Sequence, residues 1–297
     1  MKRFTNNLKT KPFKTSPLFV VLGFFLVVYT LIMISLFGYA LISSFKDLGG
    51  FIDDPVGLPK EWHWENYLRV LEGMAVSRGK GLPMAYIEHM FLNSIVYSVG
   101  CALANTICTT LMAYACATHK NFVSKTIYAL VIFMIIFPII GSLPSELQMA
   151  KTLGLYDSML GNFFLKFSFG NVYFLVLYEA FRAMPKDYIE AAQLDGANQF
   201  QIMMRVMLPM ARNTIGTIML VLFVGFWNDY QTPLVYLPSK PTVALGLLLF
   251  THNTSGIYSG EPLKLAAAIM VLIPILLIYA FFQKSLMGNL TVGGVKG

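Results

Sequence analysis

The chain of 297 residues is 56% hydrophobic and only 12% charged, and its mean hydropathy is +0.63. Soluble domains carry about 25% charged residues, so this composition excludes an ordinary soluble protein and predicts an integral membrane protein. The net charge of +7 does not indicate nucleic acid, because the basic residues cluster at the ends of apolar segments. The three cysteines all lie in one apolar segment, which argues against a disulfide framework.

Apolar segments predict an all-α, polytopic fold with six transmembrane helices, because each span needs about 20 apolar residues. We expect these spans near residues 17–44, 88–117, 124–145, 163–182, 210–233 and 263–283. The first segment is too long for a cleavable signal peptide. Lys166 and Glu179 interrupt the fourth near its ends, and Pro138 and Pro274 are expected to bend their spans.

Charge asymmetry predicts the orientation of the spans. With six spans both termini share one side, which holds thirteen basic and four acidic residues when neighbouring interface positions are included. The other side holds nine basic and eleven acidic residues. The positive-inside rule then places a cytoplasmic N-terminus at 1–16, a membrane domain at 17–285 and a cytoplasmic tail at 286–297.

The first loop on the outer side, about residues 45–87, is long and aromatic. Trp62, Trp64 and Tyr67 form a set suited to the membrane interface, where amphipathic rings gather. A platform for sugars is the alternative interpretation of these three rings.

A polar stretch on the cytoplasmic side, Glu190 to Pro209, predicts a helical hairpin between the fourth and fifth spans. The spacing of Asp187 and Glu190 is that of an N-cap with an acidic partner. Gly196 is placed to end the first helix in a left-handed cap, and Asn198 to cap the second. Pro209 stands where the fifth span begins. From the residues alone, a solvated connector and a docking element both fit.

The pattern Glu190-Ala191-Ala192, Gly196, Val206 and Leu208-Pro209 resembles the EAA loop of binding-protein-dependent ABC importers. Val206 stands where the family usually has isoleucine, and Asn213 stands near the place of a second proline. Further matching segments are Leu153-Gly-Leu-Tyr-Asp157, Arg182-Ala-Met-Pro185, Trp227-Asn228-Asp229 and the chain end from Gly288 to Gly297. From about residue 85 onward the chain is similar to the carbohydrate-importing branch, specifically its maltose-type second permease.

That resemblance implies that residues 186–209 form a coupling loop, whose short helix docks on a cytoplasmic ATPase. The implied contacts are Glu190, Ala191, Ala192, Asp195, Gly196 and Ala197. A second implied contact is the tail, through Gly294, Lys296 and Gly297. The implied partners are a second homologous permease, two ATPase subunits, an extracytoplasmic sugar-binding protein and a carbohydrate, which we expect to be an oligosaccharide. The implied location is a bacterial cell membrane.

Several motifs are absent from the sequence. There is no GxxxxGK[ST], so ATP and magnesium are expected on the partner ATPases and no cofactor on this chain. The four histidines are scattered, and we expect neither a metal site nor enzymatic activity. Ionisable groups are nearly absent from the centres of the spans, which weighs against the alternative of an ion-coupled secondary sugar carrier. A non-transporting membrane scaffold is a further rival.

The polar residues within the spans are mostly neutral amides and hydroxyls, which hydrogen-bond to sugars without discriminating charge. We expect Asn93, Trp227, Asn228 and Tyr230 to line the substrate path. Hydrogen bonding between helices is the alternative role for each of them.

Overall fold

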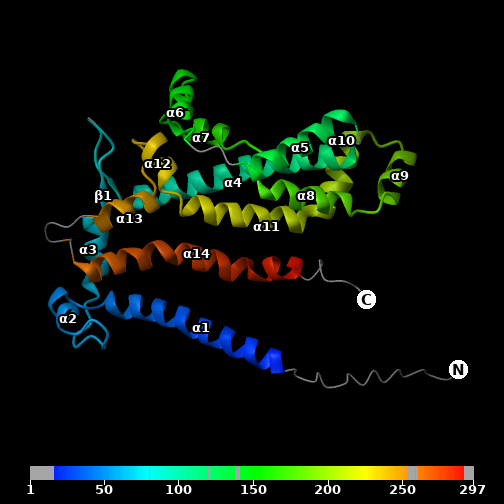
Figure 1. Cartoon of the computed structure of the whole chain (residues 1–297). Helices are drawn as coiled ribbons and strands as arrows, with labels where there is room; N and C mark the ends of the chain where they lie inside the picture. Colours follow the sequence, from blue (N-terminus) through cyan, green and yellow to red (C-terminus); the bar gives the residue numbers. More distant parts are fainter. Residues whose placement is uncertain are drawn as a thin grey trace.

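The computed structural model describes residues 17–79, 81–119, 121–137, 141–252, 258 and 260–290, of which 282–290 are described by their backbone alone. Within these residues four helices are long and apolar enough to cross a membrane. They are α1 (Pro17–Ser43), α4 (Ile87–Thr118), the helix Gln199–Trp227 and the stretch Glu261–Phe281 of α14 (Glu261–Leu290). The axes of these helices lie roughly along the length of the molecule, with the chain direction reversed between α1 and α4 and between α11 and α14 (Figure 1).

The helix Gln199–Trp227 consists of α10 (Gln199–Ile202), the π-helix η1 (Met203–Met207) and α11 (Leu208–Trp227). Shorter elements connect the long helices. They are α2 (Leu48–Asp53), α3 (Glu65–Gly73), β1 (Ala75–Val76), β2 (Ala85–Tyr86), α5 (Phe122–Ile136), α6 (Leu143–Thr152), α7 (Met159–Leu165), α8 (Val172–Arg182), α9 (Asp187–Leu194), α12 (Gln231–Tyr236) and α13 (Val243–His252). The two strands pair antiparallel, with Ala75 opposite Tyr86 and Val76 opposite Ala85.

Two large hydrophobic cores lie along α4, beside a smaller cluster of Tyr97, Cys101 and Leu237. One joins α4 to α11, α13 and α14, and its buried members include Met90, Trp227 and Val243. The other joins α4 to α5, α8 and the helix that leads into α11, with Phe174 and Met207 among its buried members. Because α4 and α11 belong to both cores, they form the frame on which the shorter helices are mounted.

The prediction of a single fourth span at 163–182 is wrong. The chain forms α7 and α8 there, separated by residues 166–171. The Asn171 side chain caps α8 by accepting bonds from the amides of Tyr173 (3.0 Å) and Phe174 (3.3 Å). From α4, Asn105 donates to the Lys166 carbonyl (3.1 Å) and Thr109 donates to the Ser168 carbonyl (3.2 Å). Within a membrane protein, a break between two helices is tolerated where protein side chains satisfy the freed backbone groups, as Asn105 and Thr109 do here.

Other predicted boundaries also move. The fifth span was expected at 210–233, but the helix starts at Gln199 and ends at Trp227, and α12 is separate. The third span was expected to reach residue 145, but α5 ends at Ile136 and α6 starts at Leu143. The first, second and sixth spans agree with α1, α4 and α14 within a few residues, apart from the extension of α14 to Leu290. The count of six spans stays a prediction, and Pro138 lies outside the described residues, whereas Pro274 lies within α14.

Gly161, in the first turn of α7, has no room for a side chain. A Cβ added there would lie 2.1 Å from the backbone oxygen of Leu155, which cannot move without shifting the chain. We therefore expect Gly161→Ala to destabilise the protein by about 1–3 kcal/mol, the usual cost of overpacking. The measurement is the thermal unfolding midpoint of the detergent-purified protein. Gly216→Ala is the control, because the corresponding Cβ in α11 meets open space; equal midpoints for both variants would contradict the expected clash.

At the end of the molecule that carries α2 and α3, a polar and aromatic cluster joins the end of α1 to the start of α3. Asn66 is buried and donates to the carbonyls of Ser44 (2.9 Å) and Lys46 (2.8 Å). The ring of Phe45 packs beneath Trp62, Trp64 and Tyr67, the three predicted interface aromatics, at centroid distances of 5.4, 4.5 and 5.3 Å. The two tryptophans are largely exposed, as an interfacial position requires.

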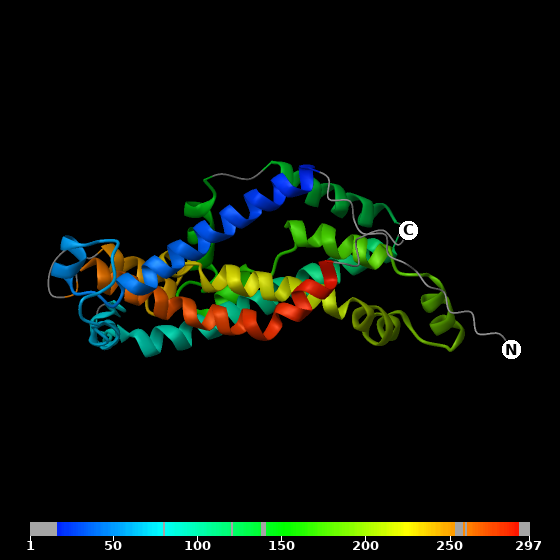
Figure 2. The ribbon, with the colours of Figure 1, turned by 90° about the horizontal axis from the view of Figure 1, so that it is seen from below.

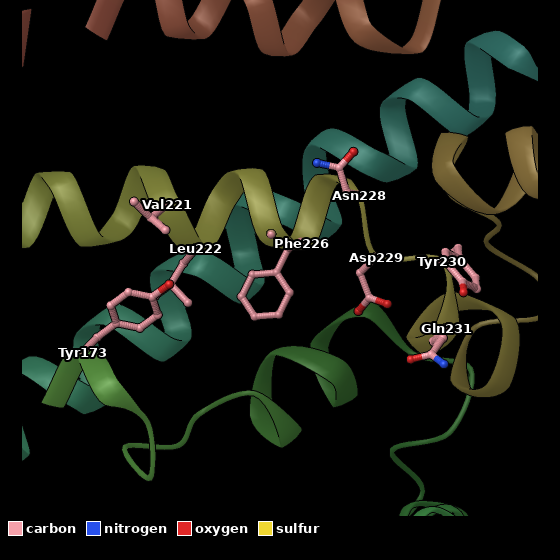
Figure 3. A pocket seen from close by; sticks show the side chains of 9 residues that line it. Tyr173, Val221, Leu222, Phe226, Asn228, Asp229, Tyr230 and Gln231 are labelled. Atoms are coloured by element: carbon pink, nitrogen blue, oxygen red, sulfur yellow. The ribbon is translucent and has the colours of Figure 1, made fainter. Parts of the chain in front are cut away.

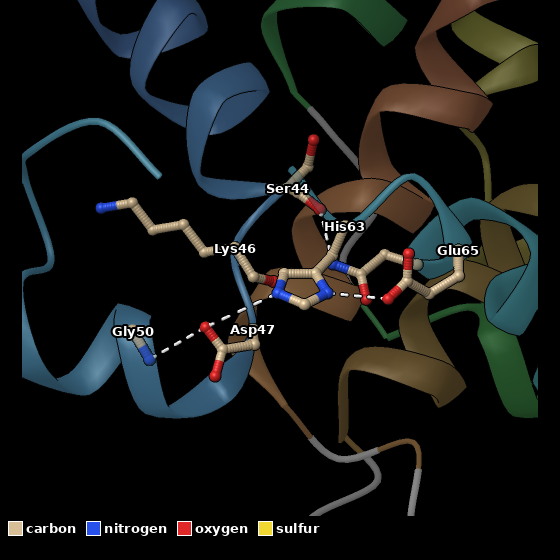
Figure 4. A network of polar contacts seen from close by, with 7 residues as sticks. Ser44, Lys46, Asp47, Gly50, His63 and Glu65 are labelled. Carbon is tan, nitrogen blue, oxygen red and sulfur yellow. Dashed lines mark hydrogen bonds and ion pairs between the residues drawn. The ribbon is translucent and has the colours of Figure 1, made fainter. Parts of the chain in front are cut away.

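His63 lies between two carboxylates in this cluster (Figure 4). Its Nδ1 is 2.7 Å from Glu65 Oε1, and its Nε2 is 4.0 Å from Asp47 Oδ1. The hydrogen bond from His63 lowers the pKa of Glu65 below its ordinary value of 4.5. The contact therefore stabilises the folded loop above about pH 4.5, and its contribution is lost as the pH falls through the lowered pKa of Glu65.

We accordingly expect acidification from pH 7 to below pH 4 to loosen the packing around Trp62 and Trp64. The measurement is the tryptophan emission maximum of the purified protein. In Glu65→Gln this component of the pH response should vanish, because the amide does not ionise. An unchanged response in that variant would assign the transition to other carboxylates.

Candidate functional site

The predicted coupling hairpin lies at the end of the molecule opposite α2. α9 extends beyond the bundle at the same end as the first residues of α1 and the last turns of α14 (Figures 1 and 2). Four of the six predicted contact residues are exposed: Glu190, Ala191, Asp195 and Gly196. The other two, Ala192 and Ala197, are half-buried and pack against the core of α4, α5 and α8. The hairpin thus presents one face outward and fixes the other to the bundle.

Local sequence explains the hairpin's shape. Gly196 has φ +82°, the left-handed conformation that glycine adopts without strain, and its amide donates to Gln193 (3.0 Å). Asn198 and Gln201 form a reciprocal capping box, each side chain accepting from the other's amide at 2.9 Å. Both predicted caps are confirmed. The predicted N-cap at Asp187 is wrong, because α9 already includes Asp187 and the preceding Lys186 gives no side-chain cap.

The second hairpin helix continues into the fifth predicted span without a break. α10, η1 and α11 form one helix from Gln199 to Trp227. In η1 the amide of Leu208 donates to Met203, five residues back. Pro209, next in the chain, has no N–H to donate, so a widened turn at this point costs fewer hydrogen bonds. Pro209 lies in the first turn of α11, as expected for the start of the fifth span. The helix does not begin there, however, because α10 and η1 precede it without a break.

A depression of about 380 Å³ lies where α8, α11 and α12 meet (Figure 3). Phe226 and Asp229 lie on the same side of α11 as Tyr173. Its wall combines aromatic, aliphatic and polar side chains, and it is lined by Tyr173, Val221, Leu222, Gly225, Phe226, Asn228, Asp229, Tyr230 and Gln231. Apolar ring faces beside hydrogen-bonding groups can hold a molecule that is itself apolar on its faces and polar at its edges.

Two of the four predicted path residues, Asn228 and Tyr230, line this depression. Trp227 does not: its side chain is 1% exposed, packs against Phe91 and Phe223, and donates from Nε1 to Val271 (3.3 Å). Trp227 and Asn228 are adjacent residues at the end of a helix. Adjacent side chains on a helix point in directions about 100° apart, so the two face different surroundings.

Asn93 also lies away from the depression. Its side-chain amide donates to the carbonyl of Pro241 (3.0 Å), so it serves the packing of a loop on α4. In this conformation Trp227 and Asn93 have the structural role that was the alternative for each.

Asp229, the one carboxylate on this wall, is not among the predicted path residues. One of its oxygens accepts the Tyr97 hydroxyl (2.8 Å), and the other accepts the Thr232 amide (3.0 Å). Tyr97 is fully buried on α4. The available signal was the spacing of Asp229 and Thr232, which is that of a side chain capping the first turn of α12.

Lys166 stands beside this group, at the end of α7. Its ammonium donates to the Thr232 hydroxyl (3.3 Å) and lies 5.9 Å from the centroid of the Phe226 ring. Within the described part of the chain no carboxylate approaches Lys166 within 4.0 Å. Among the same residues no group of three or more His, Cys, Asp and Glu is arranged to hold a metal ion.

A model of the family described as "Binding-protein-dependent transport system inner membrane component" matches residues 106–287, more than half of the chain. This chain belongs to that family. The match begins within α4 and covers the depression and the hairpin, so both candidate regions lie in the shared transport component. As an inner-membrane component with several membrane-capable helices, the transport component is a multi-pass membrane protein.

Relatives and solved structures extend this finding. The "Diacetylchitobiose uptake system permease protein NgcG" of Streptomyces coelicolor is 27% identical over 270 residues, which cover 90% of this chain and 86% of that protein. The "Arabinooligosaccharides transport system permease protein AraQ" of Bacillus subtilis is 25% identical, with 80% and 81% covered. A chain in the crystal structure of a bacterial ABC transporter involved in the import of the acidic polysaccharide alginate shares the fold, with TM-score 0.74, 23% identity, and 92% and 99% covered.

The predicted tail contact, Gly294, Lys296 and Gly297, lies outside the described residues. It stays a prediction that rests on the resemblance alone.

Proposed function

We propose that this transport component is one of two permease subunits of an ABC importer that moves an oligosaccharide across the cell membrane. The observation that carries the proposal is the depression at α8, α11 and α12, which sets three aromatic rings beside amide and carboxylate groups. Sugars have apolar ring faces and a periphery of hydroxyls, so they match that combination. The named uptake systems of the relatives, for diacetylchitobiose and for arabino-oligosaccharides, support the same substrate class.

In this proposal the α9 hairpin is cytoplasmic and docks on an ATPase partner, which binds ATP and magnesium. Two observations support that orientation: the excess of basic residues on this side, and the position of α9 at the end where α1 begins. The exposed Glu190, Ala191 and Asp195 supply the docking face. The remaining partners are a second permease, which completes the path, a second ATPase and an extracytoplasmic sugar-binding protein.

A single helix joins the two candidate regions, which gives the coupling a mechanical basis. The helix from Gln199 to Trp227 starts in the hairpin and carries Phe226 at its other end, on the wall of the depression. At 1.5 Å per residue these points are about 40 Å apart. Closure of the ATPases would move the hairpin as a rigid body, and the continuous helix would carry that movement to the depression.

The test is uptake by proteoliposomes that contain the full complex, supplied with its binding protein and with labelled maltose, melibiose or N,N′-diacetylchitobiose. We expect uptake of at least one sugar to require internal ATP and to survive collapse of the ion gradients. Tyr230→Ala should lower it about tenfold, and Leu160→Ala, at an exposed site away from the depression, should not. Uptake that follows an ion gradient without ATP would favour the secondary carrier, and no uptake of any sugar would favour the scaffold.

A further inference from the structure

Asp157, in the loop between α6 and α7, has an unusual backbone conformation. Its φ of +54° makes it the one positive-φ residue other than glycine in the described parts of the chain. Left-handed conformations cost free energy for residues with a Cβ, and they persist where the surrounding structure holds them. Asp157 is also the last residue of the Leu-Gly-Leu-Tyr-Asp segment that the sequence singled out.

Four hydrogen bonds tie Asp157 to the last residue of α12 and to the segment that follows it. Its amide donates to the Tyr236 carbonyl (2.8 Å), and its Oδ1 accepts from the Ser239 amide (3.1 Å) and hydroxyl (2.8 Å). Its carbonyl accepts from the Lys240 ammonium (2.6 Å). We name this group, Asp157 with Tyr236, Ser239 and Lys240, the Asp157 latch. Its backbone and its side chain both take part, which explains why the strained conformation is kept.

Ser239 of the latch and the start of α13 are also fixed to other parts of the molecule. Arg78 donates to the Ser239 carbonyl (2.8 Å), and the amide of Val243 donates to the Ser94 hydroxyl on α4 (2.7 Å). These bonds join the latch to the β-hairpin loop and to the α4 frame. The latch therefore has a firm support on both sides.

The latch holds one end of α12, whose first residues form part of the depression wall. α12 has six residues, too few to be stable alone, so outside contacts must set its position. Asp229 and Lys166 bind Thr232 at its start, and the latch binds Tyr236 at its end. α12 is thus held at both ends. Its first residue, Gln231, and the preceding Tyr230 both line the depression.

We propose that Asp157 is a positioning residue for sugar transport. It does not line the depression; it holds α12 so that Tyr230 and Gln231 face the sugar. This inference rests on the proposed function, because it assigns the depression to the sugar. Aspartate suits the position for two reasons: it tolerates the left-handed backbone better than most residues, and its carboxylate accepts two bonds from Ser239.

Three substitutions separate those two properties. Asp157→Asn keeps an acceptor oxygen and the tolerance of positive φ. Asp157→Gly keeps the backbone conformation and loses the acceptor. Because glycine adopts a positive φ without strain, a defect in this variant is not caused by backbone misfolding. Asp157→Ala loses both. Asp53→Ala, an exposed aspartate on α2, is the matched control.

The experiment combines hydrogen exchange with uptake of the three labelled disaccharides by the full complex. We expect Asp157→Gly and Asp157→Ala to speed exchange at the Ser239 amide and to raise the half-saturating sugar concentration about tenfold, while the ATP-limited maximal rate changes less. Asp157→Asn should restore most of both properties, and Asp53→Ala should resemble wild type. Rescue by asparagine and a change in apparent affinity are results that simple loss of folded protein would not give.

Two results would overturn the proposal. Unchanged exchange at Ser239 in Asp157→Ala would show that the latch does not hold the segment. Faster exchange with unchanged sugar dependence would show that the latch does not position the wall. If the wild-type complex imports none of the sugars, that result contradicts the proposed function. The hydrogen-exchange data would then still show whether Asp157 holds the segment around Ser239.

Discussion

Gly196→Pro is expected to reduce ATP-driven sugar uptake to background while the protein still inserts in the membrane. Gly196 has φ +82°, which proline cannot adopt because its ring fixes φ near −65°. Proline also removes the amide that donates to Gln193. The end of α9 must then reorganise, and the docking face of Glu190 and Ala191 loses its orientation towards the ATPase.

The measurement is uptake in proteoliposomes beside the amount of membrane-inserted protein. Gly196→Asn is the matched control, because asparagine tolerates the left-handed conformation and keeps the amide. Glu190→Lys should also abolish uptake by reversing the charge on the docking face. Normal uptake in both Gly196→Pro and Glu190→Lys would remove the basis for assigning the hairpin to ATPase docking.

Asp229→Ala is expected to lower uptake about tenfold or more, although its side chain is small and lies at the edge of the depression. The substitution leaves the hydroxyl of Tyr97 buried without its acceptor and frees the first turn of α12. An orphaned buried hydrogen-bonding group costs about 1–3 kcal/mol. At 1.4 kcal/mol per tenfold, this cost alone corresponds to roughly 5- to 150-fold in an equilibrium constant.

A double-mutant cycle with Tyr97→Phe separates the two consequences. If the orphaned hydroxyl carries the loss of stability, the double variant should be more stable than Asp229→Ala, as judged by its thermal midpoint. Uptake should stay low in the double variant, because Thr232 is still without its acceptor. Strict additivity of the two substitutions would show that Tyr97 and Asp229 act independently.

The sequence predicted those parts of the fold that are determined by residues close together in the chain. The long apolar runs identified α1, α4 and α14, and the properties of Gly196 and Asn198 located the turn of the hairpin. The division of the fourth span was missed, because its cause lies in α4. Asn105 and Thr109 compensate the backbone of residues 166–171 from about sixty positions away, and no local pattern in those residues announces that contact.

The candidate site was predicted in part for the same reason. The Trp227-Asn228-Asp229 segment was recognised, but which of its side chains faces the depression depends on where α11 ends. The structure directs Trp227 into the core against α14 and leaves Asn228 and Tyr230 on the wall. Tyr173 and Gln231 come from elements whose boundaries were misplaced, so their approach to α11 was not visible in the sequence.

The π-helix between Met203 and Met207 lets the hairpin keep its direction although the turn holds one additional residue. A π-turn accommodates one residue more than an α-helix would over the same path. Deleting one residue there would therefore give a regular α-helix with the hairpin in nearly the same direction, whereas deleting one residue from the regular part of α11 would rotate everything before it by about 100°. We expect transport to tolerate a deletion within Met203–Met207 better than a deletion within the regular turns of α11.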